Sequence, residues 1–259
     1  LFAALRHLRY VDKIRVLWVD ALCIDQSNIA ERNLQVARMS EIYSNAEKVL
    51  VWLGEAADSS NLAFAFIDRV LGVDRLDGLV KDENTLDMWH ALTNLMRRTW
   101  FSRRWVVQEL ALAKRAIMLC GEDTVEWEKF SDAVGLFDMK FDDIVQLYVD
   151  SHKMQGEIES MFYVRALSGA YRLVNVLGNL FRRSSSGQIK ERLLNLEDLV
   201  LNLPSFQAKD PRDTIYSLLS LARDTNPTPD LSPAKFNSFE VNYQKSIIAV
   251  FRDFVAFSI

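Results

Sequence analysis

Two short apolar runs in the first 54 residues have the composition of buried strands. RVLWVD at residues 15–20 stops at a carboxylate, and KVLVWLG at residues 48–54 stops at a glycine. Between them Asn28 and Glu31 resemble a capping box, and apolar side chains recur on one helical face, namely Ile29, Val36, Met39 and Tyr43. The pattern predicts a strand, a helix and a second, parallel strand.

A third apolar run, AIMLCG at residues 116–121, predicts another parallel strand. We expect a helix over residues 103–114 to lead into it, with Ser102 as its N-cap. Residues 59–99 carry two helical patterns, around residues 62–71 and 86–96. We interpret them as an insertion on one edge of the sheet.

No strand pattern stands out beyond residue 127. Apolar residues recur at helical spacing over residues 128–137 and 142–180, and RRSSSG at residues 182–187 is the clearest polar loop. The fold class that follows is α/β, with a small parallel sheet flanked by helices and then a mainly helical C-terminal region.

Charge and composition exclude several classes of function. A formal net charge of -4 gives no basic field for nucleic acid. The apolar runs are far shorter than the roughly 20 residues that cross a bilayer, so we expect no membrane span. Cys23 and Cys120 lie in or beside apolar segments without metal-binding spacing, and are expected to be reduced, buried thiols of a cytoplasmic protein. Neither HExxH nor a glycine-rich phosphate loop is present, so we expect no metal and no bound cofactor.

Trp105 and Glu109 are the strongest candidates for chemistry. They are four residues apart, so on a helix their side chains share a face and can flank one ligand. The helix that leads into a parallel strand starts at the carboxyl edge of the sheet, where open α/β folds bind ligands. An aromatic ring beside a carboxylate suits a flat cationic group such as nicotinamide. The alternative is that Trp105 fills core and Glu109 is a solvated helix residue.

Two aspartates follow the first predicted strand. Asp20 and Asp25 would therefore also lie at the carboxyl edge, where they can bind ribose hydroxyls or a divalent cation. The competing interpretation is that Asp25 caps a turn or helix start while residues 22–24 pack inward.

Arg103 and Arg104 lie in the first turn of the predicted helix, where positive charge opposes the helix dipole. A bound phosphate would relieve that cost. Pairing with carboxylates such as Glu55 or Asp58 would do so equally well.

The segment DPRD at residues 210–213 has the residue types of a helix start. Asp210 fits the N-cap, Pro211 the first helical position and Asp213 the third. Arg212 and Tyr216 are the residues whose types a cap does not require.

Several of these stretches together resemble the fungal heterokaryon-incompatibility (HET) domain. The similar segments are LWVDALCIDQ at 17–26, the helix of residues 31–46, VLVWLG at 49–54, WFSRRWVVQE at 100–109, Cys120-Gly121 and DPRDTIY at 210–216. The resemblance implies a HET domain over residues 1–130 and a helical extension over residues 131–259. The family's opening ALSYxWG strand is not found, and the chain starts at Leu1 rather than Met, so we expect a piece of a longer polypeptide.

The resemblance implies an intracellular module that triggers growth arrest or cell death when incompatible fungal cells fuse, often controlled by a sensor or allelic partner protein. HET domains have been likened to TIR domains, which have a flavodoxin-like sheet. SRRWVVQEL at residues 102–110 is similar to the TIR pattern Ser-x-Trp-Cys-x-x-Glu-Leu, with Val106 in place of the cysteine and one extra residue before the tryptophan. The equivalent glutamate is catalytic in NAD-cleaving TIR domains, which makes Glu109 the candidate catalytic residue.

Three hypotheses follow. In the first, the protein hydrolyses the nicotinamide–ribose bond of NAD, with Glu109 stabilising the oxocarbenium ion, Trp105 stacking on nicotinamide, and Asp20 and Asp25 lining the ribose. In the second, the protein is a non-enzymatic module that signals death by self-association. In the third, the helical half covers the active surface of the first half or binds a partner.

Overall fold

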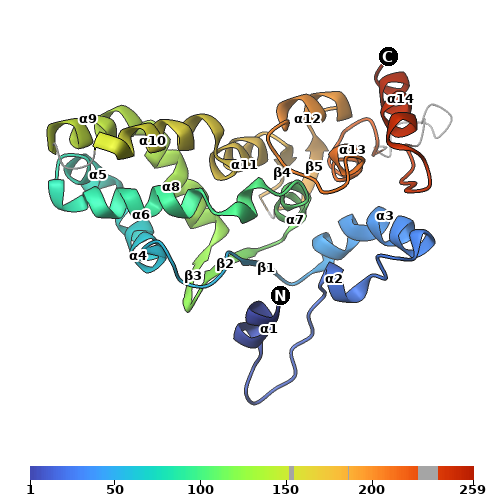
Figure 1. Ribbon diagram of the computed structural model, residues 1–259, viewed down its shortest axis with the longest axis horizontal. Helices are drawn as coiled ribbons and strands as arrows, with labels where there is room; N and C mark the ends of the chain where they lie inside the picture. Colours follow the sequence, from blue (N-terminus) through green and yellow to red (C-terminus); the bar gives the residue numbers. More distant parts are fainter. Residues whose placement is uncertain (152–154, 186, 227–238) are drawn as a thin grey trace. The chain divides into compact units, whose positions relative to one another are not determined.

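The computed structural model describes residues 1–151, 155–185, 187–226 and 239–259 (Figure 1). The chain divides into two compact units built from interleaved segments. Unit 1 comprises residues 1–8, 48–102 and 115–175, and unit 2 comprises residues 9–47, 103–114 and 176–259. Each unit is described by itself. The division into a HET domain and an extension at residue 130 stays a prediction.

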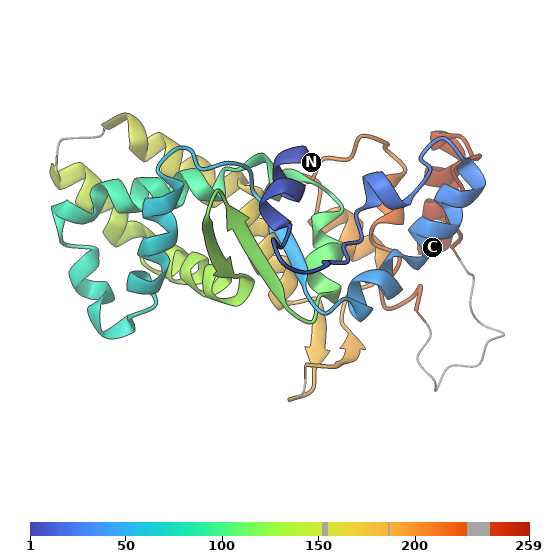
Figure 2. The same ribbon diagram turned by 90° about the horizontal axis from the view of Figure 1, so that it is seen from below.

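Unit 1 contains a three-stranded sheet in the order β1 (Val49–Trp52), β2 (Ala116–Cys120), β3 (Asp123–Glu126). Strands β1 and β2 are parallel, with Val49 opposite Ala116, which confirms that predicted pairing. Strand β3 runs antiparallel to β2 (Figure 2) and was not predicted, because the four residues DTVE are mostly polar. The sheet is therefore mixed.

Gly121 makes the turn from β2 to β3 possible. Its φ is 54°, in the left-handed region, and a Cβ at this position would lie 2.8 Å from the Cβ of Ala56. A side chain here would meet both backbone strain and a steric clash. This accounts physically for the glycine that ends the third apolar run.

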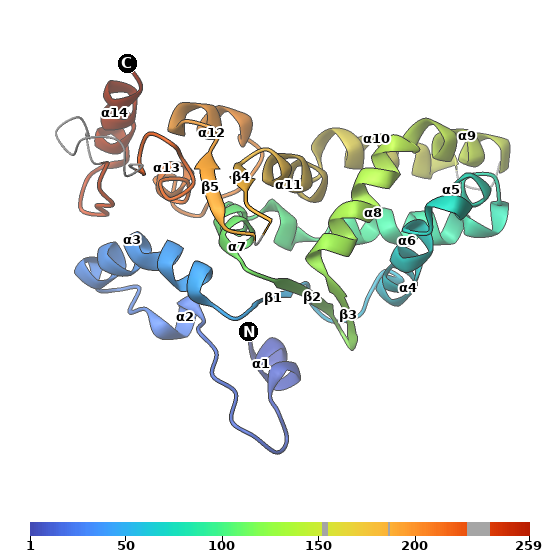
Figure 3. The ribbon, with the colours of Figure 1, turned by 180° about the vertical axis from the view of Figure 1, so that it is seen from behind.

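Helices α6, α8 and α10 lie on one side of the strands and α1 lies on the other (Figures 1 and 3), and α8 follows directly from β3. Helix α4 packs against α6 and α8, and α9 packs against α10. The predicted helical patterns around residues 62–71, 86–96 and 128–137 are confirmed as α4, α6 and α8. The helices are α1 (Phe2–Leu8), α4 (Ser60–Val70), α5 (Val73–Leu79), η1 (Glu83–Thr85), α6 (Leu86–Met96), η2 (Thr99–Ser102), α8 (Trp127–Met139), α9 (Phe141–Ser151) and α10 (Gln155–Leu167).

The core of unit 1 is built from aromatic rings. Phe66 meets the edge of Trp89 at 4.7 Å between centroids, and Phe101 stacks on Phe130 at 5.3 Å. All four side chains are essentially inaccessible to solvent. Their large apolar area makes this cluster the main source of stability in unit 1.

Unit 2 is mainly helical, with a two-stranded hairpin. Its elements are α2 (Asp20–Cys23), α3 (Ile29–Asn45), α7 (Val106–Leu112), β4 (Phe181–Arg183), β5 (Ile189–Arg192), α12 (Leu196–Asn202), α13 (Asp213–Tyr216) and α14 (Ile247–Ser258); α11 (Gly169–Gly178) crosses the boundary between the units. Helix α3 packs against α7. The hairpin was missed, because its strands flank what the sequence shows as a polar loop.

The predicted start of α3 is confirmed. The Asn28 side chain accepts hydrogen bonds from the N–H groups of Ala30 and Glu31. In a capping box the Glu31 carboxylate would accept from the N–H of the N-cap residue, Asn28. Here it accepts from the N–H of Asp25 instead. The polar residues before α3 thus fix the approach of the preceding loop.

Two predictions about local structure were wrong. Residues 15–19 form no strand, and Ile14 and Val16 are 93% and 91% exposed, so the apolar run has no sheet to join. Helix α7 begins after Trp105, and the Ser102 hydroxyl donates back to the Thr99 carbonyl within η2 instead of capping α7. Because no strand precedes Asp20 and Asp25, the reason for placing them at the carboxyl edge of the sheet no longer holds.

The α/β class with a helical C-terminal region is confirmed by the elements above. Cys120 is buried as predicted, but Cys23 is exposed, and neither is in a disulfide. Among the described residues, none of the helices combines the length and apolar character that crossing a bilayer requires.

Candidate functional site

Glu109 lies within unit 2 in a small cluster of ionisable side chains. The Glu109 cluster consists of Asp20 at the start of α2, Tyr43 on α3, Arg103 before α7 and Glu109 on α7. The Glu109 side chain is 13% exposed, and its Oε1 lies 4.0 Å from Nη2 of Arg103. Trp18 packs edge-on against the ring of Tyr43, with centroids 5.8 Å apart. A carboxylate is thus held in a mostly dry site with one cationic neighbour.

Burial sets the protonation of this cluster. It raises the pKa of Glu109 to about 7, an effect opposed by Arg103 and increased by the charge of Asp20. Burial also raises the pKa of Tyr43 well above its ordinary value, with Glu109 adding to the rise, so Tyr43 stays a neutral phenol. Glu109 therefore populates both its acid and its carboxylate forms near neutral pH, as a group that exchanges protons must.

Trp105 is fixed by residues far along the chain. Its indole N–H donates to Oδ2 of Asp213 at 3.1 Å, and the Tyr243 hydroxyl donates to Oδ1 of the same carboxylate. The guanidinium of Arg32 lies 3.5 Å from the centroid of the Tyr243 ring and 4.0 Å from Oδ1 of Asp213. We call Arg32, Trp105, Asp213 and Tyr243 the Asp213 network. It holds the orientation of the indole beside the start of α7.

Asp213 is more than the helix-start residue predicted from the sequence. It is 7% exposed, and burial raises its pKa, opposed by the hydrogen bonds from Tyr243 and Trp105. Helix α13 begins at Asp213 with Arg212 at the N-cap position, so the predicted N-cap role of Asp210 is wrong. The Asp210 carboxylate instead accepts from the Arg212 N–H and guanidinium.

Arg212 and Tyr216, whose residue types a helix cap does not require, both bind the backbone of residues 242–245. The Arg212 guanidinium donates to the carbonyls of Tyr243 and Lys245, and the Tyr216 hydroxyl donates to the carbonyl of Asn242. This segment carries the Tyr243 hydroxyl to Asp213. In the sequence, the one signal of this contact was that a helix start does not require the residue types of Arg212 and Tyr216.

Arg103 and Arg104 have different surroundings. Arg104 is 1% exposed, and its guanidinium donates to the carbonyls of Leu203 and Thr214, while burial lowers its pKa to about 10. The Arg103 side chain is 51% exposed and faces Glu109. Arg104 is thus committed to backbone carbonyls, and of the two arginines Arg103 is the one that a ligand can reach.

The two aspartates also differ. Asp20 is exposed, accepts from the N–H of Ala21, and acts electrostatically on Glu109. Asp25 accepts from both the N–H and the hydroxyl of Ser27, which lowers its pKa. Asp25 therefore forms a local turn, and the structure brings Asp20 but not Asp25 into the Glu109 cluster. Within the described ranges, no group of three potential metal ligands occurs.

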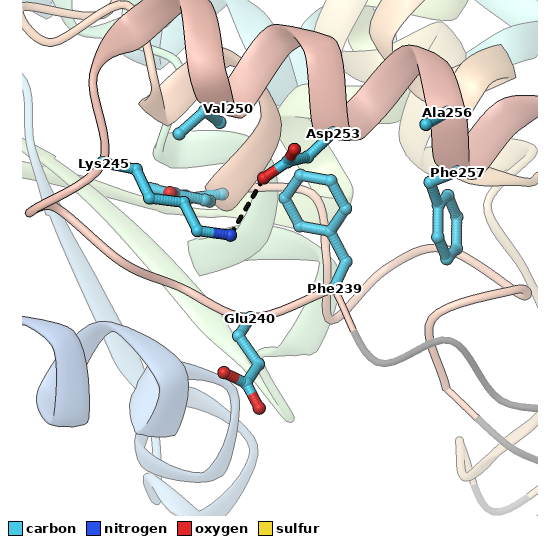
Figure 4. A pocket seen from close by; sticks show the side chains of 8 residues that line it. Phe239, Glu240, Lys245, Val250, Asp253, Ala256 and Phe257 are labelled. Atoms are coloured by element: carbon cyan, nitrogen blue, oxygen red, sulfur yellow. Dashed lines mark hydrogen bonds and ion pairs between the residues drawn. The ribbon is translucent and has the colours of Figure 1, made fainter.

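Two cavities lie elsewhere in unit 2. The larger, of about 540 Å³, is bordered by α3, Gln108 of α7 and described residues within 216–226 and 239–241. The smaller, of about 280 Å³, lies beside α14, where the ion pair of Lys245 with Asp253 forms part of the wall (Figure 4). Tyr216, Phe239 and Glu240 contribute to both linings. Glu109 belongs to neither.

Comparison with known proteins gives two findings. Residues 1–109 match the family described as "Heterokaryon incompatibility protein (HET)". The chain is also 30% identical over 267 aligned residues to "Heterokaryon incompatibility protein 6, OR allele" from Neurospora crassa, an alignment that covers 86% of this chain and 37% of that protein. The chain therefore spans little more than a third of the length of this relative. No solved structure matches. The matched segment ends at Glu109, so it contains every residue of the Glu109 cluster.

Proposed function

We propose that this chain, whose residues 1–109 match the heterokaryon incompatibility family, is part of a fungal protein that triggers cell death on incompatible fusion by hydrolysing NAD. One observation carries the enzymatic part of this proposal. Glu109, within the matched segment, is a nearly buried carboxylate with a pKa of about 7 beside one partly exposed arginine. Such a group is a recognised mark of a reactive site.

The reaction breaks the bond between the nicotinamide nitrogen and C1′ of the ribose. The bond's electron pair leaves with nicotinamide, which becomes neutral, and C1′ becomes oxocarbenium-like. Water then adds to C1′ and releases a proton, so NAD and water give ADP-ribose, nicotinamide and a proton. The ionised form of Glu109 stabilises the positive charge on the ribose, and the low local dielectric strengthens this attraction.

The neighbours of Glu109 have complementary roles in this proposal. Arg103, which is half exposed, attracts the pyrophosphate of NAD and keeps part of Glu109 ionised. Trp105 offers the face of an indole whose N–H is already bound to Asp213, so its ring is oriented before a ligand arrives. Asp20 is exposed and available to a ribose hydroxyl.

The test is NAD loss and nicotinamide release by the purified protein at high concentration. We expect turnover by the wild type, rising with pH through about 7 as Glu109 ionises, and at least a hundredfold loss in Glu109→Gln, on the order of a removed electrostatic contact to the transition state. The matched control is Glu41→Gln, on an exposed position of α3. Equal turnover by wild type and Glu109→Gln, or none by a folded wild type, rejects NAD hydrolysis.

A separate observation favours self-association as a second candidate function. Residues 9–47 expose several large apolar side chains in one stretch of unit 2: Ile14 at 93%, Val16 at 91%, Leu22 at 61% and Leu34 at 58%. Sedimentation velocity of the wild type beside Val16→Asp and Leu34→Asp tests this candidate. Concentration-dependent assembly that the two variants lose supports it, and a wild type that stays monomeric at high concentration rejects it.

A further inference from the structure

The larger cavity of unit 2 has the features of a binding site for a small molecule. Its volume of about 540 Å³ falls in the range of roughly 300–1,000 Å³ that is usual for small-molecule pockets. Its lining combines apolar side chains of α3, such as Leu34 and Val36, and the aromatic ring of Phe239 with a similar share of polar side chains. Apolar and aromatic surfaces can hold a planar ligand, and the polar groups among them can fix its orientation.

Gln108 is the polar group that most needs a ligand. It is 2% exposed and lines the cavity, and its amide nitrogen donates to the Ser220 hydroxyl at 2.6 Å. Its Oε1 has no hydrogen-bond partner among the residues that the structure describes. Turning the amide over would only exchange the two ends, because one end must still face Ser220 and the other would then be unpartnered. A buried amide oxygen without a hydrogen-bond partner lowers the stability of the fold by about 1–3 kcal/mol. A ligand that donates a hydrogen bond to this oxygen would recover that free energy.

Charge narrows the class of ligand. No lysine, arginine or histidine is present among the described residues that line this cavity, and Glu240 contributes an exposed carboxylate. Figure 4 shows that carboxylate pointing away from the Lys245–Asp253 pair. A phosphate or carboxylate ligand would meet repulsion here without any compensating cation. Because the Glu240 carboxylate is exposed to water, it does not require a cation either, and the site suits a neutral molecule.

Aromatic residues favour a flat ligand. Phe239 lies edge-on to Tyr216, with ring centroids 6.4 Å apart, and both line the cavity. Planar heteroaromatic rings pack well against such side chains. A glutamine amide pairs with an exocyclic amine or a primary carboxamide, since it accepts from N–H through oxygen and donates through its second N–H.

We propose that this cavity binds a neutral, planar heteroaromatic molecule bearing an exocyclic amine or a primary carboxamide, with the Gln108 amide as its anchor. Nicotinamide and adenosine are the two sources of this chemistry that we would test. The site is distinct from the Glu109 cluster, and the proposal does not depend on NAD hydrolysis.

Isothermal titration calorimetry with two ligand pairs tests the chemistry. Nicotinic acid replaces the carboxamide of nicotinamide by a carboxylate, and purine riboside lacks the exocyclic amine of adenosine without gaining another N–H donor on the base. We expect nicotinamide or adenosine to bind at least about tenfold more tightly than its matched partner, as expected for one lost hydrogen bond and an unpaired group. Which pair shows this difference identifies the source. Absence of binding by both nicotinamide and adenosine at millimolar concentration overturns the proposal.

Two variants test the location. Gln108→Leu keeps the side-chain volume but removes the amide, and should weaken binding about tenfold. Ala37→Phe fills the cavity from an exposed position of α3, so the fold should tolerate it while binding is lost. Gln146→Leu, at an exposed position of unit 1, is the matched control and should bind as the wild type does. Circular dichroism establishes that each variant is folded. Unchanged affinity in both folded Gln108→Leu and folded Ala37→Phe would overturn the proposal.

Discussion

The two units of this protein bury different kinds of polar groups. In unit 1 they are small hydroxyls, each bonded to a nearby backbone group: Ser60, Thr85, Thr93 and Ser168. Unit 2 also buries one such hydroxyl, that of Ser217, but in addition it buries an arginine, a glutamine and an aspartate, and it contains the glutamate with a pKa of about 7. Hydroxyls that bond locally cost little, whereas charged and amide groups in a dry place need specific partners. Unit 1 is built for stability, and unit 2 carries groups that can do chemistry.

The largest expected effect tests the aromatic core of unit 1. Phe101→Ala should lower the free energy of unfolding by about 3–5 kcal/mol, because it removes a fully buried ring and leaves a cavity beside Phe130. Urea denaturation measures it. Phe2→Ala, at a position that is 80% exposed, is the matched control and should change stability by less than about 0.5 kcal/mol. Similar losses in both variants would contradict the account of this core.

The next effect is a pH dependence that originates in unit 2. The pKa of Glu109 is raised from 4.5 to about 7, so the folded protein holds this proton more tightly than the unfolded chain. Stability from this group is fully present below pH 4.5 and declines by about 3 kcal/mol as the pH rises from 4.5 to 7. Glu109→Gln should remove that decline in urea titrations between these pH values, while Glu41→Gln should keep it. An unchanged pH slope in Glu109→Gln would show that burial does not raise this pKa.

A smaller loss of stability should follow from removing the Tyr243 hydroxyl from the Asp213 network. Tyr243→Phe keeps the ring that Arg32 stacks on but removes the donor to the Asp213 carboxylate, and should cost about 2 kcal/mol. Tyr163→Phe, at a half-exposed position of unit 1, should cost less than about 0.5 kcal/mol. Hydrogen exchange should show faster opening around Trp105 and Asp213 in Tyr243→Phe. Unchanged hydrogen exchange around Trp105 and Asp213 in Tyr243→Phe would show that the Tyr243 hydroxyl does not stabilise the network.

The smallest effect concerns the buried hydroxyls of unit 1. The Thr93 hydroxyl donates to the Trp89 carbonyl one helical turn earlier, and that carbonyl lies inside α6. Thr93→Val should therefore change the unfolding free energy by less than about 1 kcal/mol. Thermal unfolding is a sufficient measurement. A loss above about 2 kcal/mol would mean that unit 1 also relies on its buried polar groups.

The sequence predicted those parts of the fold whose signals are local. Strands β1 and β2 were found because each is a short apolar run followed within two residues by glycine, and α3 because Asn28 caps it. The run at residues 15–20 has the same composition but no sheet partner. Whether an apolar run pairs depends on distant residues, so composition alone cannot separate the two cases.

The candidate site shows the same limit. The spacing of Trp105 and Glu109 predicted that they occupy successive turns, and the N–H of Glu109 bonds to the carbonyl of Trp105. The partners of Trp105 are more than a hundred residues away, and DPRD has the composition of an ordinary helix start. The raised pKa of Glu109 also depends on how deeply α7 is buried, which residue types do not reveal.

Because Asp213 and Tyr243 hold Trp105, the order of synthesis on the ribosome matters for this protein. The segments of unit 1 have all been translated by residue 175, whereas unit 2 needs residues beyond 239. Since chains emerge N-terminus first and fold as their parts become available, unit 1 can form while the Glu109 cluster is still unsupported. A nascent chain would then carry Trp105 and Glu109 without the contacts that orient the indole until Tyr243 leaves the exit tunnel. Any activity that depends on those contacts can begin only after that point of synthesis.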